Sequence, residues 1–198
     1  MLKRILSFSL LLFFISACTT QQQSTTLTYK NYKIEKPTKF NSSVVQMLAP
    51  YTDSINKTMY QVIGFSTKGL SKKQPESDLG NFMTDCMREM AQQKFGKKVD
   101  AAFVNYGGIR GYILKGDITV GSIFEVMPFD NLIVIQEVKG NVFKLFLNNI
   151  AEKGGWPVSG ITMQIKDKKP VNILVNGKPI DDNTTYIVAN SDYIALQG

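Results

Sequence analysis

The sequence predicts an α+β domain, built of mixed sheets with helices packed on them. Segments of strand length and segments of helical periodicity both occur, and they follow one another without the strict alternation of a parallel βαβ sheet. Of the 198 residues, 43% are hydrophobic and 20% are charged, which is ordinary for a globular protein with a real core. These observations indicate one folded domain, preceded by a short leader.

The leader is the segment MLKRILSFSLLLFFISAC, which has two basic residues, an apolar run and small residues before Cys18. This order is typical of a signal peptide over residues 1–17, and the run is shorter than the roughly 20 residues of a spanning helix. The final ISAC resembles the lipobox of bacterial lipoproteins. It implies lipidation of Cys18 and a bacterial envelope location, at the outer membrane or the periplasmic face. A plain secretory signal with an incidental cysteine is the alternative.

A polar segment, residues 18–28, predicts a flexible tether, so the domain is expected over residues 29–198. Cys86 is the only other cysteine, so a chain lipidated at Cys18 has no internal disulfide and depends on packing. Without Lys3 and Arg4 of the leader, the formal net charge falls from +7 to about +5, which suits an anionic ligand or surface without demanding one.

The first elements of the domain are expected before residue 67. SVVQMLAPYTDSINKTM predicts a helix that is broken at Pro50, and YQVIGFST predicts a strand.

ESDLGNFMTDCMREMAQQKFG predicts the clearest helix. Ser77 or Asp78 can cap its start, and Gly96 can end it. Six residues with i, i+3, i+4 spacing are expected in the core: Leu79, Phe82, Met83, Cys86, Met87 and Met90. On such a face a cysteine is expected to be a packing residue and not a reactive thiol.

Strands and helices are mixed over the rest of the chain. VDAAFVN predicts a strand, NYGGIRG a turn, DITVGSIFEVMPF a short strand with a helical turn, and NLIVIQEV another strand. NVFKLFLNNIAEKGG predicts a helix that stops at Gly154, with Val142, Phe143, Phe146, Leu147 and Ile150 on its apolar face. ITMQIKD, VNILVNG and TYIVANSDYIAL predict strands, with Asn176-Gly177 as a hairpin turn.

The composition excludes several kinds of chemistry. The chain has no histidine, so it contains no Ser-His-Asp triad, no Cys-His pair and no ordinary zinc site. Its acidic residues are scattered, it has no GxxxxGK(S/T) phosphate loop, and YGGIRG lacks the spacing of a dinucleotide-binding turn. We therefore assign no catalytic residue, no metal ligand and no cofactor to this chain.

The stretch FVNYGGIRGYI contains groups suited to binding. Gly107 and Gly108 follow a predicted strand and let backbone N–H groups approach a ligand closely. Arg110 can offer a planar fork of donors to phosphate or sugar oxygens, and Asn105 can both donate to and accept from a ribose hydroxyl or a base edge. The alternative is a plain tight turn with Arg110 on the surface.

Two aromatic residues, Phe129 in MPFDN and Tyr193 in NSDY, lie at the ends of predicted elements, where a ring need not belong to the core. Two facing rings can clamp a flat base, with roughly 1 to 3 kcal/mol from each stacked face. Core packing of each ring is the alternative.

Taken in order, ESDLGNFMTDCMRE, DAAFVNYGGIRGYILKGDITVGSIFEVMPFDN and TYIVANSDYIA resemble the C-terminal domain of the 5'-nucleotidase family. That family includes periplasmic UDP-sugar hydrolases and animal ecto-5'-nucleotidases. The resemblance runs from about Val62 to Gly198. In the family, a separate N-terminal metallophosphatase domain holds two metal ions, and the C-terminal domain grips the nucleoside.

The resemblance implies a role for each binding group. Asn105 and Arg110 are expected to contact sugar, base or phosphate, and Phe129 and Tyr193 to stack on the two faces of the base. Tyr106 departs from the family's triple-glycine turn, and this change is expected to narrow the pocket or to disfavour a backbone with positive φ.

Three further departures stand out. Basic residues often precede the LGN helix in the family; here only Lys72 and Lys73 are near, and neither is assigned that role. The family pattern continues beyond ALQG, so the C-terminus is expected to be truncated or unusual. No stretch of the chain resembles the metallophosphatase domain.

The leading hypothesis is the nucleotide- or nucleoside-binding half of a split 5'-nucleotidase-type hydrolase that acts in nucleotide catabolism. A separate metallophosphatase subunit is expected to supply the divalent metals, and this chain is not expected to be catalytic alone. The alternative is a stand-alone nucleotide- or nucleoside-binding envelope lipoprotein, and a third possibility is a remnant that folds poorly. The membrane is a further expected partner, through the lipid anchor, and a nucleic-acid polymer is not.

Overall fold

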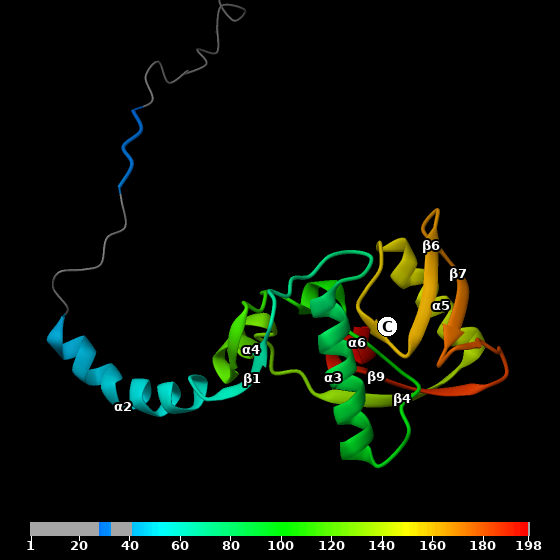
Figure 1. Cartoon of the computed structure of the whole chain (residues 1–198), viewed down its shortest axis with the longest axis horizontal. Coiled ribbons are helices and arrows are strands. Elements are labelled where there is room, and N and C mark those ends of the chain that lie inside the picture. Colours follow the sequence, from blue (N-terminus) through cyan, green and yellow to red (C-terminus); the bar gives the residue numbers. More distant parts are fainter. Residues whose placement is uncertain (1–27, 33–40, 198) are drawn as a thin grey trace, which may run out of the picture. The chain divides into compact units, whose positions relative to one another are not determined.

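The computed structural model of this protein describes residues 28–32 and 41–197 (Figure 1). The predicted signal peptide, Cys18 and nearly all of the tether lie outside these residues, so they stay predictions. The chain divides into two units, Met1–Ser42 and Ser43–Gly198, and the sheets belong to the second. Within the described ranges, no helix combines the length and apolar content needed to cross a membrane.

Three sheets lie within the described part of the second unit. The largest has the strand order β4-β9-β2-β5, another pairs β1 with β3, and the last has the order β6-β7-β8. The strands are β1 (Val62–Ser66), β2 (Ala101–Phe103), β3 (Gly116–Thr119), β4 (Ile133–Lys139), β5 (Val158–Ser159), β6 (Ile161–Lys166), β7 (Lys169–Val175), β8 (Lys178–Pro179) and β9 (Thr185–Ser191). Because β2 runs parallel to β9, while β4 pairs antiparallel with β9 and β5 pairs antiparallel with β2, the predicted α+β class with mixed sheets is confirmed.

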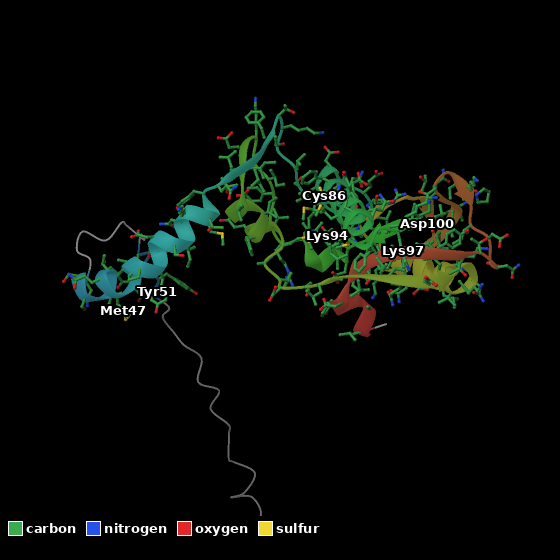
Figure 2. The ribbon with its side chains drawn as sticks, turned by 90° about the horizontal axis from the view of Figure 1, so that it is seen from below. Met47, Tyr51, Cys86, Lys94, Lys97 and Asp100 are labelled. Atoms are coloured by element: carbon green, nitrogen blue, oxygen red, sulfur yellow. The ribbon has the colours of Figure 1, made fainter. Side chains whose placement is uncertain are left out.

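The short strand β2 is buried on both faces. Ala101 and Phe103 belong to one core cluster, which includes residues of α5, and Ala102 belongs to another, which includes a residue of α3. Just before the strand, the Asp100 carboxylate accepts a hydrogen bond from the backbone N–H of Ile187 in β9 (3.0 Å); Figure 2 labels Asp100. The start of β2 is thereby fixed against its parallel neighbour.

The helix α5 (Gly140–Glu152) packs against β4 and β7. Its predicted apolar face is largely correct, since Phe143, Leu147 and Ile150 are fully buried and Phe146 is half-buried. Val142 was wrongly placed on that face and is 52% exposed. It lies in the first turn of the helix, at the edge of the apolar stripe.

The helix α3 (Asp78–Phe95) lies across β4 and β9 (Figure 1) and has the predicted ends. The Ser77 hydroxyl accepts a hydrogen bond from the Gly80 N–H (3.1 Å), and Gly96 ends the helix with φ +62°, a conformation that glycine adopts without steric cost. Its fully buried residues are Leu79, Gly80, Thr84 and Ala91.

The predicted core role of Cys86 is wrong, as are those of Phe82 and Met90. All three side chains are exposed, and Figure 2 shows Cys86 on α3. The reason is that α3 packs closely through small residues: a Cβ added to Gly80 would lie 2.9 Å from the Pro157 ring. This close packing leaves Phe82, Cys86 and Met90 on the solvent side, whereas Leu79 is buried and Met83 and Met87 are half-buried against the core.

Cys86 nevertheless fits the expectation of an unreactive thiol. Partial burial raises the pKa of the Cys86 thiol, and the neighbouring carboxylates of Glu89 and Asp85 raise this pKa further. Because the thiolate is the nucleophilic form, a raised pKa lowers the fraction of reactive thiolate at neutral pH.

The helix α2 (Ser42–Met59) continues through Pro50, so the predicted break is wrong. None of its residues is buried, and the side chains of Met47 and Tyr51, labelled in Figure 2, are 64% and 68% exposed. Solvent can satisfy the backbone carbonyl that Pro50 leaves without its N–H partner. The Thr52 hydroxyl also donates to the Leu48 carbonyl in the same turn (3.0 Å).

The C-terminal stretch TYIVANSDYIAL is not one strand as predicted. β9 ends at Ser191, and the short helix α6 (Asp192–Gln197) follows. Polar groups stop the strand: the Asp192 carboxylate accepts from the N–H groups of Leu132 (3.1 Å) and Tyr193 (2.9 Å). The Asn176-Gly177 hairpin is confirmed, with φ +49° and +75° between β7 and β8.

We predict that Gly140→Ala strongly destabilises the protein. The Gly140 N–H donates to the Thr184 carbonyl (2.9 Å), and a Cβ added at this position would collide with the backbone carbonyl of Asp181. Overpacking of this kind costs about 1–3 kcal/mol and sometimes more, and here backbone atoms block relaxation. The midpoint of urea unfolding measures the loss.

The matched control for this prediction is Gly64→Ala in β1. An added Cβ there meets no atom closer than 3.8 Å, at the Ile118 side chain. Its unfolding midpoint should stay near that of the wild type. Equal midpoints for the two variants would contradict the assigned role of Gly140.

Candidate functional site

The loop after β2 carries most of the predicted binding groups. Its first part is a 3-10 turn, η1 (Tyr106–Gly108), in which the Gly108 N–H donates to the Asn105 carbonyl (2.8 Å). None of the described residues with positive φ lies in this turn. The expected conflict between Tyr106 and a positive φ therefore does not arise.

Two glycines of this loop are needed because other atoms lie close to their Cα atoms. A Cβ added to Gly108 would lie 2.7 Å from Oδ1 of Asn105, so this position must stay bare for the carboxamide to lie over it. A Cβ added to Gly111 would lie 2.9 Å from the carbonyl oxygen of Glu125 in α4 (Val120–Val126). Between them, the Arg110 N–H donates to the Val126 carbonyl (2.7 Å), which fixes the loop on the end of α4.

Arg110 and Phe129 are brought together. The Arg110 guanidinium carbon lies 5.3 Å from the centroid of the Phe129 ring, within cation–π range. Both side chains are exposed, and no described carboxylate pairs with Arg110. The ring supports the guanidinium while its donors stay open to an anionic or oxygen-rich ligand.

Asn105 and Tyr193 share a pocket of about 270 Å³. The Asn105 side chain is half-buried, makes no hydrogen bond within the described structure and lines the pocket from the end of β2. Tyr193 lines it from the first turn of α6 with a ring that is 49% exposed. Neither aromatic residue of the predicted pair is a core residue.

The segment that carries Phe129 is tied to the turn that carries Tyr193. The Leu132 N–H donates to the Asp192 carboxylate (3.1 Å), and the Asp192 N–H donates to the Leu132 carbonyl (2.9 Å). These reciprocal hydrogen bonds join two segments that are distant in the sequence. The face-to-face arrangement of the two rings stays a prediction.

Lys72 is a structural residue of this site that sequence reasoning missed. Its ammonium donates to the carbonyls of Ile109 (2.5 Å) and Tyr106 (3.2 Å) and lies 4.3 Å from the centroid of the Tyr106 ring. The only sequence signal for Lys72 is that Lys72 and Lys73 stand shortly before α3. The contacts span more than 30 residues of sequence, which no local pattern reveals.

The acidic residues do not form a metal site in the described part of the chain. Within residues 28–32 and 41–197, no three acidic or cysteine side chains gather closely enough to hold a metal ion. What the loop, Phe129 and the pocket offer is a set of hydrogen-bond donors beside exposed rings. Such a set can bind a flat ligand that carries oxygen acceptors or negative charge.

We predict that Lys72→Ala lowers the free energy of unfolding by about 1–2 kcal/mol, because two charge-assisted hydrogen bonds to the loop carbonyls are lost. Lys73→Ala is the matched control, since its exposed side chain makes no such bond. Urea unfolding of both variants checks the difference. A loss in Lys73→Ala as large as that in Lys72→Ala would show that loop anchoring is not the cause.

Two relatives of this chain have names that refer to nucleotides. It is 30% identical over 186 residues to the trifunctional nucleotide phosphoesterase protein YfkN of Bacillus subtilis, covering 83% of this chain and 13% of that protein. It is 28% identical over 155 residues to a 5'-nucleotidase of Vibrio cholerae, covering 75% of this chain and 28% of that protein. The chain thus spans a minor part of the length of these relatives.

A solved structure supports the same fold. The 5'-nucleotidase precursor from Thermus thermophilus superposes with a TM-score of 0.64 at 29% identity, covering 79% of this chain and 34% of that one. The family model described as the 5'-nucleotidase C-terminal domain matches residues 62–198, which include the loop after β2, Phe129 and Tyr193. The chain therefore belongs to the 5'-nucleotidase C-terminal domain family.

Proposed function

We propose that this domain binds a nucleotide or nucleoside and contributes to nucleotide hydrolysis together with a separate metallophosphatase subunit. The observation that carries the proposal is the exposed Arg110 guanidinium on the Phe129 ring, in a member of the 5'-nucleotidase C-terminal domain family. A cation beside a ring matches a nucleotide, which combines an anion with a flat base. The names of the relatives from Bacillus subtilis and Vibrio cholerae support the same ligand class.

Each residue of the site has a proposed role. The Arg110 guanidinium donates to phosphate or sugar oxygens, and the exposed backbone of Gly107 lies beside the same ligand. Phe129 and Tyr193 stack on the base, with roughly 1–3 kcal/mol from each face. The Asn105 carboxamide, held over Gly108, bonds to the sugar or the base edge.

The proposal assigns the divalent metals to the partner subunit. The described residues hold no acidic or cysteine cluster that fits two metal ions, and none of the 198 residues is a histidine. This chain would contribute by orienting the ester, which can lower a barrier substantially without a catalytic side chain. We propose that both subunits act in the bacterial envelope and that a lipid on Cys18 anchors this one.

A stand-alone nucleotide- or nucleoside-binding lipoprotein is the second candidate. It is favoured by the fact that Arg110, Phe129, Asn105 and Tyr193 all come from this chain and are accessible without a partner. In that case affinity alone, without hydrolysis, is the activity. The two candidates share the ligand site and differ in the need for a metallophosphatase.

Calorimetric titration of the protein with AMP, adenosine and UDP-glucose tests the binding site. We expect dissociation constants between about 1 μM and 1 mM, since Arg110, Phe129 and Tyr193 are exposed to solvent. Arg110→Ala should weaken the binding of AMP about tenfold or more and the binding of adenosine less, because the lost hydrogen bonds are to the charged phosphate oxygens of AMP. Phe129→Ala should weaken the binding of both AMP and adenosine, because stacking on the base is lost.

Phe95→Ala is the control for the aromatic substitution, because Phe95 is 45% exposed and Phe129 is 44% exposed, and Phe95 lies at the end of α3. It should leave every affinity unchanged. A folded protein that binds none of the three ligands would refute the ligand site. A phosphatase assay with divalent metal, run with and without a copurifying metallophosphatase, then separates the half-enzyme from the stand-alone receptor.

Gly108 gives an independent test of the site. Gly108→Ala should displace the Asn105 carboxamide and weaken adenosine binding about threefold to tenfold, because the added Cβ occupies its place. Gly64→Ala in β1, outside this loop, is the matched control, since its Cβ meets no atom closer than 3.8 Å. Calorimetry measures both, and equal affinities for the two variants would show that Asn105 does not contact the ligand.

A further inference from the structure

The pocket shared by Asn105 and Tyr193 has a second wall that the proposed function does not use. The C-terminal half of α5 supplies Phe146 and Asn149, Lys153 follows directly after the helix, and Trp156 comes from the next loop. The pocket volume of about 270 Å³ is just below the range of about 300–1,000 Å³ for whole drug-sized ligands. It therefore suits a single ring system better than an entire nucleotide.

The apolar part of this wall is held in place. Trp156 meets Phe146 edge to face with 5.9 Å between ring centroids, and Phe146 in turn packs on the buried Phe103 of β2 at 4.4 Å. The Gln74 carboxamide donates to the Gly155 carbonyl (2.7 Å), immediately before the tryptophan. A ring entering the pocket meets surfaces that are already positioned.

The polar part of the wall has no internal partners. The carboxamide of Asn149 and the ammonium of Lys153 make no hydrogen bond and no ion pair within the described residues. The Lys153 ammonium lies 5.2 Å from the centroid of the Trp156 ring, a cation–π contact that holds it at the pocket. An ammonium can only donate, so its complement is an acceptor atom on the edge of the bound ring.

We propose that this wall reads the edge of the ligand's base and that Lys153 makes the domain prefer a base with a ring carbonyl oxygen over its amino counterpart. The proposal rests on the proposed nucleotide-binding function. Hypoxanthine and uracil present a carbonyl oxygen where adenine and cytosine present an amino group. The oxygen accepts from the ammonium, whereas the amino group would place one donor against another.

Asn149 contributes affinity without distinguishing a base that has a ring carbonyl oxygen from one that has an amino group. Its carboxamide carries both a donor and an acceptor, so it can pair with either kind of edge. Tyr193 and Trp156 provide ring surface that every base can contact. Among the groups of this wall, Lys153 alone carries a charge, and its ammonium can only donate, so it is the specificity-determining residue.

Trp156 is the only tryptophan among the 198 residues, so its fluorescence reports on this pocket specifically. The experiment titrates the protein with IMP against AMP and with UMP against CMP, following Trp156 fluorescence and heat in parallel. The wild type should bind IMP and UMP about tenfold more tightly than AMP and CMP, as one charge-assisted hydrogen bond allows. Lys153→Met, which keeps the apolar stem, should reduce the preference to about twofold or less.

Two further variants sharpen the result. Lys153→Gln restores a donor together with an acceptor and should bind both members of each pair about equally. Lys166→Met, on an exposed lysine at the end of β6, is the control and should keep the wild-type preference. Urea unfolding midpoints close to that of the wild type show that the Lys153 variants are folded.

The outcomes separate this inference from the proposed function. Equal affinities within each wild-type pair, or a preference that survives Lys153→Met, would overturn the role of Lys153. Binding that is seen as heat without any change in Trp156 fluorescence would also overturn it, while nucleotide binding itself would stand. A folded protein without binding by either method would overturn both.

Discussion

The burial of β2 on both faces is the constraint on which the rest of the structure depends. Ala101 and Phe103 pack into the core that α5 covers, while Ala102 packs into the core beneath α3. A three-residue strand has no room for adjustment, because a slip by one position would exchange its two faces. The loop that carries Asn105 and Arg110 therefore leaves the sheet at a fixed point and in a fixed direction.

Much of the fold could be predicted because local chemistry determines it. Ser77 and Gly96 bound α3 through interactions within one turn, and Asn176-Gly177 closes a two-residue hairpin. The exposed Cys86 could not be predicted, because it depends on how closely α3 approaches its neighbours. The helix α6 was missed for a related reason, since the Asp192 contacts that end β9 are made with Leu132, 60 residues away.

In the candidate site too, residues in short motifs could be predicted, whereas residues placed by contacts between distant segments could not. Arg110 and Phe129 were accessible to sequence reasoning because each stands in a short motif, and the structure then brings them into contact. Lys72, Lys153 and Trp156 stand in no motif, and their positions depend on contacts between distant segments. Sequence could therefore point to the family and to a proposed ligand class, whereas the second wall of the pocket emerges only from the packing of α5 against β2.

The reciprocal hydrogen bonds between Leu132 and Asp192 have a consequence for the lifetime of the protein. They join the segment before β4 to the turn after β9, so the positions of Phe129 and Tyr193 depend on the folded chain. A ligand that binds only the folded state adds to the free energy of unfolding, by about 2.7 kcal/mol at one hundred times its dissociation constant. Under the proposed function, a nucleotide at such concentrations would raise the resistance of the folded chain to heat and proteases.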